Sequence, residues 1–496
     1  MVGVFAAIGS IQVIAILAGL LRSKTIAVML GPEGAGITGI VDQIIQFVSS
    51  ISALGLPYAA VRFLSRAHSE SKERFQRTYA AFLKALLLLS FGATAVLIAL
   101  VALRPALLGT DAARYQVYVM IAALSMPCLM LSGLIKNAFA SAGFPRSASL
   151  FSAVAAVGTA LAAVTGIYAG GISGYYWAEL ILGTAVTAGA LYYLRCRLDL
   201  SVLLRHTSAL QELRRNPGVL PFMLMFLGTS VAFTFSFLIA RYAVLHYYGE
   251  ADTGLLHALL AIALAVNVVL TPINGLLLAP KMNRAIAYDE KRRAALQFQK
   301  ILLLVLAAAA VPMVLFLQFF LTLLFSAKFT SVSAHLYLFV LAQSLFQLAG
   351  VYSALLIGMD DIKTSAIVTL IGHLAFSALA WLAAPSLGIF GVGIAYCIAT
   401  ALTVALAYWR LHARHEFRIP GNAVWLTIFA VATILGTGLL ANALGPDRPL
   451  VIALKMAVYA AALGGLLTLM GKPDRAELLA LTRRTLRRVR RSSPTR

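Results

Sequence analysis

Basic residues interrupt apolar stretches of this chain at places where charge is costly. Arg22 and Lys24 lie in the first such stretch, and Arg241 lies in a second stretch that resembles it. A charge at the centre of a bilayer costs roughly 2.5–3.5 kcal/mol on insertion scales, so such residues usually face protein or water. Guanidinium and ammonium groups donate charge-assisted hydrogen bonds to phosphate. These residues therefore predict a polyanion-binding site inside a membrane.

Basic residues outnumber acidic ones within the apolar stretches. Seven bases remain there after the loops are excluded, against two acids, Asp42 and Glu179. The bases are Arg22, Lys24, Arg62, Lys136, Arg241, Lys281 and Lys455. Lys455 is expected to snorkel to the membrane surface, whereas for Arg62 and Lys281 snorkelling competes with a role in a cavity. The excess of positive charge indicates that an anionic group visits the interior.

Acidic and histidine residues offer fewer candidates. Asp42 is expected at the depth of Arg22 on a neighbouring helix, which predicts a structural ion pair. Glu179 could pair internally or carry a proton. His257 and His373 are interpreted as satisfied core residues, with proton coupling as the alternative. The candidates for substrate binding are Arg22, Lys24, Arg62, Lys136, Arg241 and Lys281, and those for an ion pair or proton coupling are Asp42 and Glu179.

Composition places these residues in an all-α polytopic membrane protein. The chain is 61% hydrophobic and 12% charged, with a mean hydropathy of +0.90, and a helix needs about 20 apolar residues to cross the hydrocarbon. Fourteen spans are predicted, at residues 5–30, 37–63, 79–103, 115–141, 148–169, 174–194, 219–246, 256–282, 298–325, 335–358, 365–386, 389–410, 423–443 and 450–471.

The first twelve spans form two tandem repeats of six. The turn at Gly31 recurs at Gly249, and the turn that begins at Gly171 recurs at Gly388, at nearly the same separation along the chain. An even number of spans per repeat predicts two six-helix lobes related by a pseudo-twofold axis along the membrane normal. We predict an N-lobe at 1–200, a cytoplasmic connector at 201–218, a C-lobe at 219–410, an extra helix pair at 423–471 and a basic cytoplasmic tail at 472–496.

Charge in the loops predicts the orientation. Placing both termini in the cytoplasm assigns 29 of the 40 bases to that side and four to the other, as the positive-inside rule requires. The net charge of +22 is therefore mostly topological, and nucleic acid is not an expected partner. The tail is either a solvated anchor or an amphipathic segment on anionic lipid. Three scattered cysteines predict neither a disulfide framework nor a metal site.

Several motifs together resemble the Wzx-type polysaccharide flippases of the MOP exporter superfamily, which include O-antigen and enterobacterial common antigen translocases. The motifs are Gly9-Ser10, Gly19-Leu20-Leu21-Arg22-Ser23-Lys24, Gly31-Pro32-Glu33-Gly34-Ala35-Gly36, Arg241-Tyr242 ahead of Gly254, and Leu324-Phe325-Ser326-Ala327-Lys328-Phe329. The resemblance extends over about residues 5–410, and the extra helix pair departs from the twelve-span members.

The resemblance implies a MOP-type fold and a function in cell-surface polysaccharide and lipopolysaccharide biosynthesis. Such a protein moves undecaprenyl-diphosphate-linked oligosaccharide from the inner to the outer leaflet of the bacterial inner membrane by alternating access. Arg22, Lys24 and Arg241 carry over as cavity residues. The implied partners are the lipid-linked oligosaccharide, membrane lipids and the polysaccharide polymerase and chain-length machinery.

Other function classes have different sequence requirements. A MATE-like cation or drug antiporter would use intramembrane carboxylates, and here the bases exceed the acids. A membrane glycosyltransferase would be expected to carry catalytic acids on a large outer loop, and no phosphate-binding nucleotide loop is found. A passive lipid scramblase stays open as an alternative. No catalytic residue, cofactor or metal is therefore predicted.

Overall fold

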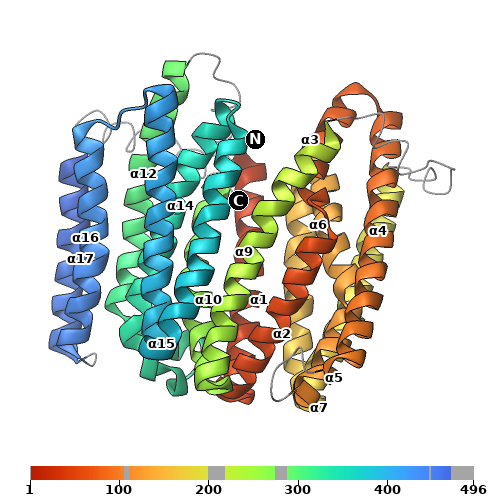
Figure 1. Cartoon of the computed structure of the whole chain (residues 1–496), viewed down its shortest axis with the longest axis horizontal. Helices are drawn as coiled ribbons and strands as arrows, with labels where there is room; N and C mark the ends of the chain where they lie inside the picture. The colour runs from red at the N-terminus through yellow and green to blue at the C-terminus, as the bar shows by residue number, and fades with distance from the viewer. Residues whose placement is uncertain (1, 106–111, 199–217, 274–287, 446–447, 471–496) are drawn as a thin grey trace, which may run out of the picture. The chain divides into compact units, whose positions relative to one another are not determined.

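The computed structural model describes residues 2–105, 112–198, 218–273, 288–445 and 448–470. Helices make up nearly all of this part of the chain (Figure 1). Those of the first half are α1 (Val2–Met29), α2 (Gly31–Ser52), α3 (Leu56–Glu70), α4 (Lys72–Leu103), α5 (Ala112–Leu124), α6 (Met126–Ser141), α7 (Pro145–Leu198) and α9 (Val219–Tyr248). Those of the second half are α10 (Glu250–Ile273), α12 (Tyr288–Leu315), α13 (Leu317–Leu324), the 3₁₀ helix η4 (Ala327–His335), α14 (Leu336–Gly358), α15 (Ile362–His415), α16 (Gly421–Leu444) and α17 (Pro449–Leu469).

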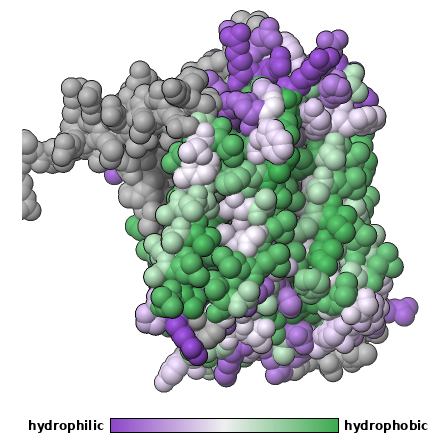
Figure 2. All heavy atoms as spheres, turned by 90° about the vertical axis from the view of Figure 1, so that its left-hand side faces the viewer, coloured by the Kyte–Doolittle hydropathy of each residue, from purple (hydrophilic) through white to green (hydrophobic). Residues whose placement is uncertain are grey.

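Each predicted span overlaps one or two of these helices, and α7 and α15 carry two spans each. Among the described residues, nine helices are long and apolar enough to cross a membrane, or ten if the bent pair α2–α3 is one span. The face over α16 and α17 shows hydrophobic side chains between two hydrophilic ends (Figure 2). The all-α membrane-spanning architecture is thereby confirmed.

The chain forms two compact units, residues 1–238 and 239–496, so that α9 begins in the first unit and ends in the second. Each unit has its own apolar core. In the first, Leu64, Leu86 and Leu134 are fully buried; in the second, Leu355, Leu411 and Phe417 are. The predicted connector, 201–218, lies almost wholly outside the described residues, as does the basic tail. The predicted lobe boundaries therefore stay predictions.

Glycine and proline residues determine where the helices start and bend. Gly31 has a φ of +70° and opens α2, with Pro32 in the first turn. The predicted span at 37–63 is bent by 50° between α2 and α3, because Gly55 has a φ of +73° and Pro57 starts the next helix. A side chain at Gly55 would clash with the carbonyl of Met223.

The longest helices, α7 and α15, are each two helices joined at a glycine turn, which in α7 is Gly170-Gly171 and in α15 is Gly388. Gly171 has φ +60° and ψ −140°, and Gly388 has φ +56° and ψ −139°. Beside the first turn, a Cβ on Gly166 would lie 2.5 Å from the carbonyl oxygen of Gly174, so the two arms touch through their backbones. The two glycines that match in the predicted repeat therefore have the same backbone conformation.

A polar cluster ties helix ends together in the second unit. Asp361 precedes α15, accepts hydrogen bonds from Thr364 at 2.7 Å and from Arg414 at 3.1 Å, and is 8% exposed. Burial opposes ionisation of Asp361, but these hydrogen bonds and the nearby arginines outweigh it and lower its pKa. Lys291 donates to the carbonyl of Gly358 at 2.6 Å. The helix ends at this side of the unit are thus fixed by polar and charged contacts.

We predict that Gly171→Ala and Gly388→Ala each destabilise the protein by about 1–3 kcal/mol, since an L-residue is strained at this φ and ψ. Thermal unfolding in detergent measures the effect. Gly189→Ala is the matched control, because Gly189 lies in the same helix, in open space, where alanine is favoured. Equal melting temperatures for all variants would contradict the strained-turn argument.

Candidate functional site

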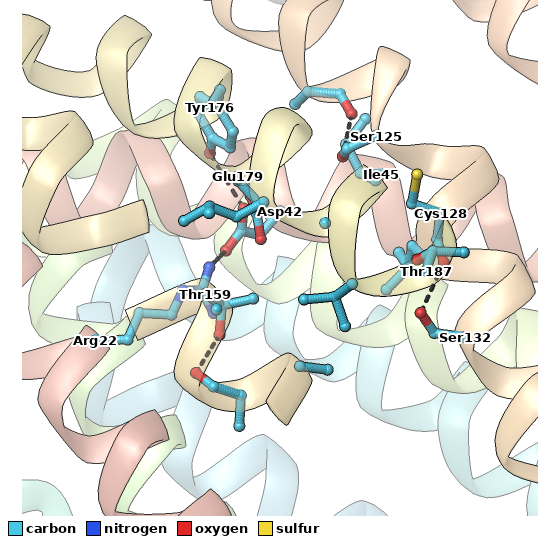
Figure 3. A pocket seen from close by; sticks show the side chains of 18 of the residues that line it. Arg22, Asp42, Ile45, Ser125, Cys128, Ser132, Thr159, Tyr176, Glu179 and Thr187 are labelled. Atoms are coloured by element: carbon cyan, nitrogen blue, oxygen red, sulfur yellow. Dashed lines mark hydrogen bonds and ion pairs between the residues drawn. The ribbon is translucent and has the colours of Figure 1, made fainter. Parts of the chain in front are cut away.

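A cavity of about 310 Å³ lies inside the first unit. Its walls come from α1, α2, α7 and the α5–α6 pair, whose side chains are shown in Figure 3. The lining residues are Arg22, Asp42, Ile45, Gln46, Ala122, Ser125, Cys128, Leu129, Ser132, Ala155, Ala156, Gly158, Thr159, Tyr176, Glu179, Leu182, Gly183, Val186 and Thr187. Three charged side chains therefore share a mainly apolar space.

The ion pair expected between Arg22 and Asp42 is present at one end of this cavity. Nη2 of Arg22 lies 2.5 Å from Oδ2 of Asp42, with the two side chains 29% and 22% exposed. Nε of Arg22 also donates to the hydroxyl of Tyr175 at 2.8 Å, and its guanidinium lies 5.5 Å from the Tyr175 ring centroid. Tyr176 donates to Oδ1 of Asp42 at 3.1 Å. Both charges are thus held by buried tyrosines.

The turn at Gly171 positions these tyrosines. Tyr175 and Tyr176 directly follow Gly174, where the arms of α7 touch, and both are almost completely buried. Glu179 lies one helical turn further along the same helix. Figure 3 shows its side chain next to Asp42. Tyr175, Arg22, Asp42 and Tyr176 therefore form one hydrogen-bonded network, with the carboxyl group of Glu179 beside it.

Hydroxyl groups also line the cavity, with Thr159 near Arg22 and Ser132 away from the ion pair (Figure 3). Ser132 donates to the carbonyl of Cys128 at 2.8 Å, and Thr159 donates to that of Ala156 at 2.9 Å. Donation to the helix backbone leaves the lone pairs of these oxygens available to the cavity. With two carboxyl groups and one guanidinium, the site suits a proton or a small cation better than an anion. No cluster of three metal-ligating side chains occurs among the described residues.

The cavity gathers three of the predicted residues, Arg22, Asp42 and Glu179, and not the other bases. Lys24 is partly buried on α1. Arg62 and Lys136 are exposed on α3 and α6. In the second unit Arg241 is 7% exposed, and Lys281 lies outside the described residues. Lys455 does not snorkel as expected: it is 3% exposed, and its ammonium lies 5.7 Å from the ring centroid of Phe316. The roles assigned to the other side chains stay predictions.

Sequence reasoning overlooked Tyr175 and Tyr176. The sequence does contain a signal for them: two consecutive tyrosines follow a repeated glycine turn. A tyrosine hydroxyl within a span needs a hydrogen-bond partner. Nothing in the sequence pairs them with Arg22, which lies 153 residues before Tyr175. That contact exists because α1 packs along α7.

The corresponding place in the second unit is closed by larger side chains. The described residues there enclose a void of only about 10 Å³, and its lining includes His373, Phe376 and Tyr396. When Gly388 is aligned with Gly171, these three residues take the positions of Ala156, Thr159 and Glu179 in the first cavity. Tyr396 donates to Oε1 of Gln343 at 2.7 Å, and His373 is buried, as expected of a core histidine. The two repeats therefore carry different side chains at these three matching positions.

Comparisons with known proteins identify the fold. No family model and no curated protein matches the chain. Among solved structures, the lipid II flippase MurJ in an inward closed conformation matches with a TM-score of 0.69 at 12% identity, covering 94% of this chain and 98% of that one. An inward-facing multidrug resistance MATE transporter of the MOP superfamily matches with a TM-score of 0.67 at 15% identity, covering 82% and 96%.

A third match is a MOP superfamily transporter from Pyrococcus furiosus described as having a binding pocket of reversed polarity. Its TM-score is 0.57 at 15% identity, and the alignment covers 83% of this chain and 95% of that one. The chain thus has the fold of MOP superfamily transporters, which confirms the predicted fold class. The Wzx-type resemblance stays a prediction.

We predict that Arg22→Met destabilises the first unit by up to about 3 kcal/mol, because Asp42 is left as a charge without its partner in a mostly apolar cavity. Arg22→Met combined with Asp42→Asn should recover much of this loss. Thermal or denaturant unfolding of wild type, the two single variants and the double variant gives the coupling energy as a double-mutant cycle. Additive effects would contradict the ion pair.

Proposed function

We propose that this protein is a flippase that moves undecaprenyl-diphosphate-linked oligosaccharide from the inner to the outer leaflet of the bacterial inner membrane. The observation that carries this proposal is the match to MurJ over 94% of the chain, against 82–85% for the MATE structures. The part of this chain that the MATE alignments leave uncovered is about as long as residues 421–496, which contain α16 and α17. A helix pair beyond the first twelve spans is the feature that favours a lipid substrate.

Exposed bases of the first unit supply an anchor for the diphosphate in this proposal. Arg62 on α3 and Lys136 on α6 belong to helices in contact, since Asn137 donates to the carbonyl of Pro57 at 2.8 Å and Ser65 bonds Ser141 at 3.2 Å. Both basic side chains are exposed. A guanidinium and an ammonium on adjoining helices can bind one phosphate each.

In this proposal the cavity has a different role from that of the exposed basic residues. Its two carboxyl groups would repel a diphosphate, so we assign Arg22, Asp42 and Glu179 to coupling with a proton or a small cation rather than to the substrate. Uptake of a proton on Glu179 would change the charge of a network that joins α1, α2 and α7. Such a change favours one packing of these helices over another, which is how a bound ion can drive alternating access.

A cation or drug antiporter is the second candidate. The observation that favours it is the same cavity, in which carboxyl groups outnumber the one guanidinium. The bases outside the cavity argue against it, because they raise the cost of a cationic substrate. A passive scramblase needs no coupling group, so the response to an ion gradient separates it from the proposed flippase.

We predict that proteoliposomes containing the protein expose a fluorescent lipid-diphosphate oligosaccharide to the opposite leaflet faster under a proton gradient. Glu179→Gln should remove most of this stimulation, because glutamine is close in size to glutamate but does not take up or release a proton. Glu290→Gln is the control, since Glu290 is exposed on α12. If the wild type translocates the lipid at a rate that no ion gradient changes, the result would favour a scramblase.

We predict that Arg62→Ala combined with Lys136→Ala weakens binding of undecaprenyl diphosphate about tenfold or more, since a charged hydrogen bond contributes roughly 1.5–3 kcal/mol. Arg62→Lys, which keeps the charge, should retain most of the affinity. Binding is measured by titration in detergent micelles. Unchanged affinity in the double variant, together with export of an organic cation, would exclude the flippase and support the antiporter.

A further inference from the structure

Four aromatic side chains gather near one end of the second unit. Tyr242, His246 and Tyr247 lie on the last turns of α9, and Trp381 lies on the first arm of α15. We call these four residues the aromatic platform. All four lie within about two helical turns of the turns at Gly249 and Gly388. The predicted topology places this end outside the cytoplasm.

Three of the rings form a compact cluster with nearly parallel planes. The ring centroids of Tyr242, His246 and Trp381 are 6.0–6.4 Å apart in every pair, and their planes differ by only 10–21°. In a linear stack of three rings, one pair would be about twice as far apart as the others. The three rings are therefore offset from one another and present their open faces and edges together.

The remaining contacts hold this surface in place. Tyr247 packs against Trp381 with ring centroids 6.0 Å apart and planes at 58°, and against His246 at 4.8 Å and 77°. The next residue, Tyr248, donates to the carbonyl of Pro385 at 3.1 Å and packs against Gly388. The rings are thus attached to the rigid turn of α15. Trp381 is 37% exposed and Tyr247 42% exposed, which leaves part of each open to a ligand.

Aromatic residues also occur singly at membrane surfaces, where tyrosine and tryptophan anchor helices. Trp409 and Trp425 fit that description, because they are 60% and 65% exposed and have no ring contact within the described part of the chain. The platform differs in that four rings from two helices meet. Anchoring one helix end does not require this convergence.

We propose that the aromatic platform binds sugar rings of the lipid-linked oligosaccharide. One face of a pyranose presents C–H groups, which carry slight positive charge and pack on the negative faces of aromatic rings. Ring nitrogens of His246 and the tyrosine hydroxyls can hydrogen-bond sugar hydroxyls at the rim. The inference rests on the proposed function. It names the part of the substrate that this surface recognises, and leaves the diphosphate to the basic residues.

The test compares two lipids that differ only in the sugar. Wild type, Trp381→Ala and Trp381→Phe are titrated in micelles with undecaprenyl diphosphate and with undecaprenyl-diphosphate oligosaccharide. We expect Trp381→Ala to bind the oligosaccharide lipid about tenfold more weakly, the effect of losing one good aromatic contact, and to bind the bare diphosphate lipid as wild type does. Trp381→Phe should recover part of the loss, and Trp409→Ala should leave both affinities unchanged.

Two results would overturn the platform. An equal loss for both lipids would mean that Trp381 supports the fold, and no loss for either would mean that it anchors the helix in the membrane. Failure of the flippase proposal is separately visible, because wild type would then bind neither lipid. In that case the oligosaccharide released from its lipid is the remaining probe: tryptophan fluorescence that responds to it in wild type and not in Trp381→Ala supports the platform, and an unresponsive wild type overturns it.

Discussion

The rest of this structure depends on the need to satisfy every backbone polar group within the hydrocarbon. Because no water is available there, the backbone stays helical along the spans, and the chain can reverse only in short turns. Gly171 and Gly388 provide two of these turns with nearly identical dihedral angles. The cavity in the first unit and the aromatic platform in the second both lie beside such a turn. The side chains for which we propose a function are therefore positioned by glycines that perform no chemistry themselves.

The two repeats share a backbone plan and differ in the side chains placed on it. In the first unit, Ala156 and Thr159 leave room beside Glu179, and a cavity results. In the second, His373 and Phe376 occupy the corresponding positions and leave almost no space. The position that corresponds to Asp42 is Leu260, which is fully buried. Duplication of one fold has thus given one unit a carboxyl-bearing cavity and the other a packed core.

Charge in this protein divides between two environments. The guanidinium of Arg22 is committed to Asp42 and Tyr175, so its positive charge is balanced within the cavity. Arg62 and Lys136 are exposed on the helices of the same unit. A count of intramembrane charges cannot separate these situations, because a paired and an exposed arginine look alike in sequence. This separation is the basis of our proposal that one group of residues couples to an ion and another binds the substrate.

The sequence by itself determined the helical class, the positions of the spans and the repeat, because hydropathy and glycine spacing act locally along the chain. It also indicated the pairing of Arg22 with Asp42, since one short turn separates their helices. Only the tertiary structure brought Tyr175 and Glu179 to that pair and Trp381 to Tyr242, because these contacts join helices that are distant along the chain. Side-chain volume decided which repeat kept an open cavity. That depends on how neighbouring helices pack, and periodicity along one helix does not encode it.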